Sequence, residues 1–151
     1  MKMLGYCGFL CDICPAFEKN IRSDKDKEEL SEKWFKYFGF RIPPEKVSCV
    51  GCKNEGYHPD EGCPVRPCAT KKGIQNCAYC DDFGCDSLKT RMDFIDNYVK
   101  EIEKIPADDY KKYIEPYLGK KRLLEIREKA GQVLIESENQ CIAVLICGNN
   151  S

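Results

Sequence analysis

The stretch Cys49-Val50-Gly51-Cys52-Lys53 carries two thiols two residues apart, with a glycine directly before the second cysteine. The glycine lets the backbone curl so that amide N–H groups point back at a sulfur atom. These N–H···S contacts offset part of the negative charge of a metal-bound thiolate. The pattern is that of a zinc knuckle. We therefore expect metal–thiolate bonds to organise the front of the chain.

Ten of the twelve cysteines fall within the first 85 residues, and two further pairs, Cys11/Cys14 and Cys77/Cys80, repeat the Cys-x-x-Cys spacing. A cysteine-rich chain without an export signal indicates metal binding rather than disulfides. The predicted metal ligands are Cys7, Cys11, Cys14, Cys49, Cys52, Cys63, Cys68, Cys77, Cys80 and Cys85.

Structural zinc takes four ligands, so ten cysteines are too many for two ions and too few for three. We predict two zinc ions. The simplest allocation leaves Cys7 and Cys63 as spare or exchange ligands. It gives the first ion Cys11, Cys14, Cys49 and Cys52, and the second ion Cys68, Cys77, Cys80 and Cys85.

An iron–sulfur cluster is the main alternative to zinc. Cys14-Pro15 and Cys63-Pro64 are similar to the Cys-Pro ends of ferredoxin cluster runs. The Cys7-x₃-Cys11-x₂-Cys14 spacing also occurs in radical S-adenosylmethionine enzymes, which need a β/α barrel of roughly 200 residues or more. Only 137 residues follow Cys14, and they lack strand–helix alternation. A weaker alternative is thiol redox sensing by Cys7 and Cys63.

Composition limits the function classes. The formal net charge is −1 with no long basic tract, so nucleic acid is not an expected partner. No segment approaches the roughly 20 apolar residues of a membrane span, and no secretory signal is present, so we expect a cytoplasmic protein. His58 is the only histidine, which leaves little for histidine-based catalysis. We expect a binding or regulatory module with a protein partner rather than an enzyme.

The predicted fold class is a small α+β protein. An irregular, metal-stapled zinc-knuckle region with short helices and small β-hairpins at the knuckles covers residues 1–90. A helical cap with an apolar tail covers 91–151, and the two parts form one compact unit. Apolar periodicity predicts helices, the first of them capped by Ser23 and ended by Gly39. The predicted helices are 24–38, 69–73, 87–104, 107–117 and 119–130. Residues 133–135 and 141–147 are β-prone and predict a C-terminal hairpin.

The order of these motifs resembles a known family. The elements are Cys7-Gly-x-x-Cys11-x-x-Cys14-Pro15-Ala16, Cys49-x-Gly51-Cys52, Cys63-x-x-Arg66-x-Cys68-Ala69, Lys72-Gly73-Ile74, Cys77-x-x-Cys80 and Phe83-x-Cys85. Over roughly residues 5–90 the chain resembles the cysteine-rich prokaryotic family catalogued as domain of unknown function 3795. The resemblance implies zinc binding through these cysteines and supplies no activity. Pro67 departs from the family pattern at the start of the helix around Cys68.

Overall fold

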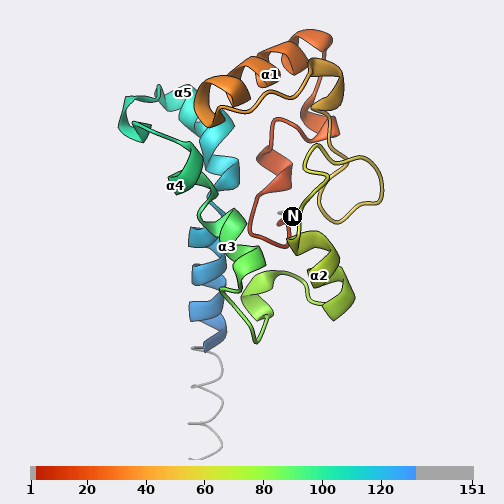
Figure 1. Cartoon of the computed structure of the whole chain (residues 1–151), viewed down its shortest axis with the longest axis vertical. Helices are drawn as coiled ribbons and strands as arrows, with labels where there is room; N and C mark the ends of the chain where they lie inside the picture. Colours follow the sequence, from red (N-terminus) through yellow and green to blue (C-terminus); the bar gives the residue numbers. More distant parts are fainter. Residues whose placement is uncertain (1–2, 132–151) are drawn as a thin grey trace, which may run out of the picture.

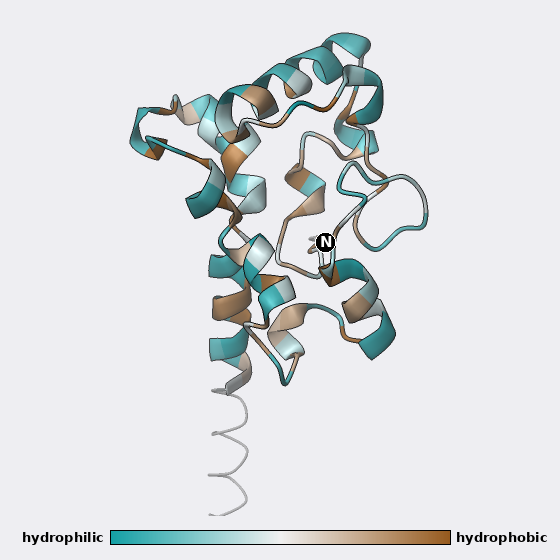
Figure 2. Ribbon diagram, viewed as in Figure 1, coloured by the Kyte–Doolittle hydropathy of each residue, from teal (hydrophilic) through white to brown (hydrophobic). Residues whose placement is uncertain are grey.

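The computed structural model describes residues 3–131. Residues 1–2 and 132–151 lie outside the described part, and the predicted C-terminal hairpin falls there. Helix α1 (Asp24–Phe38) begins and ends at the predicted residues. The Ser23 side chain accepts a hydrogen bond from the Asp26 amide at 3.4 Å, and Gly39 ends the helix with φ of 79°. The outward side of α1 is mostly hydrophilic in Figure 2.

The predicted α+β class is wrong for the described residues, because they contain no β-strand or sheet. Only two isolated β-bridges occur, between Leu4 and Leu10 and between Phe17 and Cys49. The cysteine pairs use 3₁₀ turns where small hairpins were expected, at Cys11–Ile13 and Cys77–Tyr79. Each turn bonds the amide of the second cysteine to the carbonyl of the first, so the backbone is satisfied locally without a partner strand.

The remaining elements are short and helical (Figure 1). They are α2 (Val65–Lys72), α3 (Asp86–Met92), α4 (Phe94–Tyr98) and α5 (Ala107–Asp109), which continues into a π-helical turn at Tyr110–Ile114. Single 3₁₀ turns lie at Glu18–Asn20, Pro44–Lys46, Ile102–Lys104 and Glu115–Tyr117. Residues 119–131 form a last helix as far as the described part extends.

The predicted helix over 87–104 is in fact two helices and a turn. The chain leaves helical geometry at Asp93, becomes extended at Val99, and has φ of 51° at Glu101. The break occurs because Leu88 and Ile95, which share one apolar stripe in sequence, pack into different hydrophobic clusters. One straight helix would place both side chains on the same face, whereas the break lets each side chain pack into its own cluster.

The molecule has two hydrophobic clusters, and both combine residues from the cysteine-rich and helical parts of the chain. The first, beneath α1, joins Ala16, Leu30, Trp34, Phe38, Val47, Ile95, Tyr113, Ile114 and Tyr117. The second, where α2, α3 and helix 119–131 meet, joins Cys7, Val65, Ala69, Cys77, Ala78, Leu88 and Leu123. Figure 1 shows these regions at opposite ends of the described structure.

Two glycines allow the front loop to cross the start of the last helix. Gly8 has φ of 89°, and a β-carbon there would lie 2.5 Å from the Gly119 carbonyl oxygen. Arg122 secures the crossing by donating hydrogen bonds to the carbonyl oxygens of Gly8 and Pro116 at 3.1 and 3.0 Å. Among the described residues, no helix combines the length and apolar character needed to cross a bilayer.

Candidate metal centre

The ten predicted ligands line two cavities, and none of them forms a disulfide. The larger cavity has a volume of about 400 Å³ and the smaller about 20 Å³. The six-cysteine set around the larger cavity is Cys7, Cys11, Cys14, Cys49, Cys52 and Cys63. The four-cysteine set around the smaller cavity is Cys68, Cys77, Cys80 and Cys85.

The knuckle at Cys49–Cys52 has the backbone that its sequence predicts. Gly51 adopts φ of 99°, and its amide donates to the Sγ atom of Cys49 at 3.4 Å. The loop also pairs with the front of the chain, since the Cys49 amide bonds the Ala16 carbonyl at 2.7 Å. These contacts hold Cys49 next to the Cys11–Cys14 turn, so two predicted pairs face the same cavity.

Thiols of the six-cysteine set contact one another and the core. The Cys11 and Cys52 thiols hydrogen-bond, which lowers the pKa of Cys11 and raises that of Cys52. The Cys14 Sγ atom lies 3.3 Å from the Tyr117 hydroxyl. Burial raises the pKa of Cys7 to about 12 and that of Cys14 to about 11. Without a metal the thiols of Cys7 and Cys14 therefore stay protonated at neutral pH.

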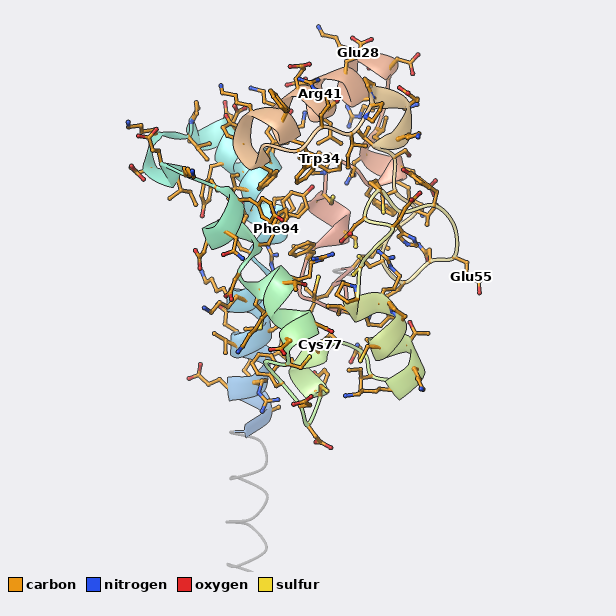
Figure 3. The ribbon with its side chains drawn as sticks, viewed as in Figure 1. Glu28, Trp34, Arg41, Glu55, Cys77 and Phe94 are labelled. Carbon is orange, nitrogen blue, oxygen red and sulfur yellow. The ribbon has the colours of Figure 1, made fainter. Side chains whose placement is uncertain are left out.

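Local structure brings the four-cysteine set together from three segments. Asn76 caps the turn that holds Cys77 by accepting a hydrogen bond from the Ala78 amide at 2.9 Å. Cys80 ends that turn, Cys85 directly precedes α3, and Cys68 lies on α2. In Figure 3, Cys77 lies in the lower part of the molecule, well below Trp34.

Two cations lie beside the four-cysteine set. Lys72 Nζ is 3.2 Å from Cys80 Sγ, and this hydrogen bond raises the pKa of Lys72. Arg127, on helix 119–131, donates to the carbonyl oxygens of Ala78 and Cys80 at 2.9 and 3.2 Å. Four thiolates around a divalent ion carry a net charge of about −2, which two adjacent cations balance. The donors and their surroundings therefore suit a zinc–thiolate site.

The structure brings together the four cysteines that the sequence assigned to one ion. It differs from that allocation at Cys7 and Cys63, which line the larger cavity with the other four cysteines. Within residues 3–131, no three Cys, His, Asp or Glu side chains are arranged as ligands of a single metal ion. The cysteines thus surround two spaces without converging on a point in either.

The sequence did not indicate which polar neighbours would face the larger cavity. His58 lines it and contacts the Gly51 carbonyl oxygen through Nε2 at 2.7 Å. Arg66 also lines the larger cavity, whereas Lys72 lines the smaller one. Arg91 lines the larger cavity as well and pairs with Asp60 at 2.6 Å. No spacing pattern links Asp60 with Arg91, which lie 31 residues apart.

Aromatic side chains also line the larger cavity, and they come from α1, α4 and the loops. The rings of Phe38 and Phe94 are 5.0 Å apart, and those of Phe9 and Tyr117 are 5.3 Å apart. Figure 3 shows Trp34 and Phe94 directed into the same part of the molecule from two elements. The lining of the cavity therefore combines thiols with aromatic rings.

Comparison with known proteins gives one match. The model of a family described as "Protein of unknown function (DUF3795)" matches residues 3–90. No curated protein and no solved structure matches the chain. The matched range contains all ten cysteines of the two sets.

Proposed function

We propose that this chain, which belongs to the family described as proteins of unknown function DUF3795, is a small zinc-binding module with a binding or regulatory role. The family supplies no activity, so the proposal rests on the chain's own residues. The observation that carries the proposal is the four-cysteine set. Its members come from α2, the Cys77–Tyr79 turn and the start of α3, and they line one small cavity beside Lys72.

Zinc suits this set chemically and sterically. Thiolates are the commonest ligands of structural zinc, and four of them complete its tetrahedral coordination. A cavity of about 20 Å³ has room for a single atom-sized guest, since one water needs about 10–15 Å³. Zinc held by four thiolates keeps no open position for water, so its role would be to hold α2 and α3 together rather than to catalyse a reaction.

This proposal places the protein in a reducing compartment, the cytoplasm, where ten unpaired thiols persist. Its partner would be another protein, because the charge balance offers no basic surface tract for nucleic acid. A thiol redox sensor is less well supported. Burial holds the pKa of Cys7 at about 12, and a reactive cysteine needs a thiolate at working pH.

Zinc analysis of anaerobically purified protein tests the proposal. We expect bound zinc in the wild type and loss of about one equivalent in Cys80→Ser, because the serine hydroxyl is a poor substitute for a thiolate. Cys141→Ser is the control, since Cys141 is not among the ten ligands predicted from the sequence, and it should leave the zinc content unchanged. A wild-type protein that folds and binds no zinc would end the proposal.

An iron–sulfur protein is the second candidate, and the volume of the larger cavity favours it. Two zinc ions, one for each set, remain the composition predicted from sequence. A space of about 400 Å³ beside six cysteines is far larger than one ion requires. The zinc assignment of the four-cysteine set does not depend on what the larger cavity holds.

A further inference from the structure

The two cysteine sets surround spaces that differ about twentyfold in volume, about 400 Å³ against about 20 Å³. The smaller space suits one ion. The larger is within the range of roughly 300–1,000 Å³ that is typical of cofactor and small-molecule sites. This difference indicates guests of different size.

The arrangement of the thiols in the six-cysteine set also indicates a guest larger than one ion. A single zinc draws its four sulfurs to about 2.3 Å from one point. The six cysteines are distributed around the wall of a space of about 400 Å³, whereas the four-cysteine set surrounds a space of about 20 Å³. In a four-iron cluster each thiolate binds a different iron, so the protein sulfurs stay apart around a body with its own inorganic sulfides.

The two loops that face each other across the cavity provide enough ligands. The front loop carries Cys7, Cys11 and Cys14, and the knuckle loop carries Cys49 and Cys52. They are held together by backbone hydrogen bonds, from the Cys49 amide to the Ala16 carbonyl at 2.7 Å and from the Glu18 amide to the Cys49 carbonyl at 2.8 Å. Three ligands from the first loop and one from the second would bind four irons.

The walls also suit a cluster. The lining includes the aromatic rings of Phe38, Phe94 and Tyr117, which offer no solvent-like polar surface to a guest, and solvent exposure is one of the factors that set cluster potential. Arg66 supplies a further feature, because its Nε is buried and has no hydrogen-bond partner among the described residues. A buried N–H donor without an acceptor is costly, and cluster or thiolate sulfur would accept its hydrogen bond.

We infer that the two cysteine sets take different metals: one zinc ion in the four-cysteine set and one four-iron, four-sulfide cluster in the six-cysteine cavity. This rests on the proposed function in so far as both are metal–thiolate sites. Cys7, Cys11 and Cys14 supply three cluster ligands, the knuckle loop supplies the fourth, and Arg66 donates to sulfur.

The test is anaerobic reconstitution of the full chain with ferric iron, sulfide and a thiol reductant, which reduces part of the iron, followed by assay of iron, acid-labile sulfide and zinc. We expect about four irons, four sulfides and one zinc per chain, with broad visible absorption. Cys11→Ala should lose iron and sulfide and keep zinc, whereas Cys80→Ala should lose zinc and keep iron. Circular dichroism checks that each variant folds.

Trp34 gives a readout that needs no variant. It is the only tryptophan in the chain and it lines the larger cavity. Cluster assembly should quench its fluorescence at least severalfold by energy transfer, and zinc alone should not. Zinc in both sets with no iron, or zinc loss from Cys11→Ala, would overturn the inference and leave the proposed function standing. A folded chain that binds iron and no zinc would defeat the proposed function and the zinc part of the inference, and would leave only the cluster assignment standing.

Discussion

The Sγ atom of Cys14 lies 3.3 Å from the hydroxyl oxygen of Tyr117, 103 residues further along the chain. Cys14 ends the first cysteine turn, and Tyr117 ends the last 3₁₀ turn before helix 119–131. Burial raises the pKa of Tyr117 well above its ordinary value, so the phenol stays protonated. The contact therefore fixes a predicted metal ligand directly to the helical part of the molecule.

Removal of this hydroxyl should weaken the fold without destroying it. We expect Tyr117→Phe to lower the free energy of unfolding by about 1 kcal/mol, because one buried hydrogen bond is lost while the ring remains. Urea denaturation followed by circular dichroism measures the effect. Tyr98→Phe is the matched control, since Tyr98 is 49% exposed, and it should change little. Equal stabilities for both variants would show that the Cys14 contact contributes nothing.

The crossing of Gly8 and Gly119 should tolerate no side chain. We expect Gly8→Ala to cost about 3 kcal/mol or more, because the new methyl combines a positive φ with a clash against the Gly119 carbonyl. Gly39→Ala separates these two causes. Gly39 has a similar φ of 79° with nothing within 4 Å of a β-carbon, so this variant should lose only about 1–2 kcal/mol. Similar losses in thermal unfolding would exclude the clash.

The helix at Asp24–Phe38 could be predicted in full because its signals are local. Ser23 supplies the cap, Gly39 supplies the left-handed end, and Leu30, Trp34 and Phe38 recur at helical spacing. The knuckle amide–sulfur contact at Cys49 was predictable for the same reason, since Gly51 is two residues away. Both features depend on residues within one or two turns of each other.

The features that were predicted incorrectly are those that depend on packing between residues far apart in the sequence. Nothing local distinguishes Leu88 from Ile95, so their assignment to two cores, and the break between α3 and α4, could not be read from periodicity. Which cavity Cys7 and Cys63 line likewise depends on how loops that are distant in sequence come together in the fold. The α+β prediction was wrong because the knuckles were expected to form hairpins, whereas their amides bond within 3₁₀ turns.

Zinc removal should loosen the region around the four-cysteine set. Cys77, Ala78 and Leu88 belong to one hydrophobic cluster, so an ion on Cys77 would stabilise that cluster as a whole. Excess chelator under reducing conditions should lower the melting temperature. The loss would be about 4 kcal/mol if free zinc otherwise stands at 1,000 times its Kd. Chelator already saturated with zinc is the control and should have no effect. An unchanged melting temperature after complete zinc loss would contradict a stabilising role.

The contact of Asp109 with α1 should make stability depend on pH. Lys33 Nζ lies 2.8 Å from Asp109 Oδ2, and the Tyr37 hydroxyl donates to the same oxygen. The Lys33 bond, followed by that of Tyr37, holds the pKa of Asp109 below its ordinary 3.8. Because the folded state favours the ionised carboxylate, its stabilisation is complete above the ordinary value and is lost as pH falls through the lowered one.

We therefore expect Asp109→Asn to lower the free energy of unfolding by about 1.5–3 kcal/mol at pH 7, the usual range for hydrogen bonds to a charged group. The difference from the wild type should shrink as pH falls below about 4, where the wild-type carboxylate also becomes protonated. Asp108→Asn is the matched control, because the adjacent Asp108 is exposed and forms no salt bridge among the described residues. Urea denaturation across this pH series measures both variants. A wild-type advantage that stays constant down to pH 2 would mean that the Asp109 charge does not stabilise the fold.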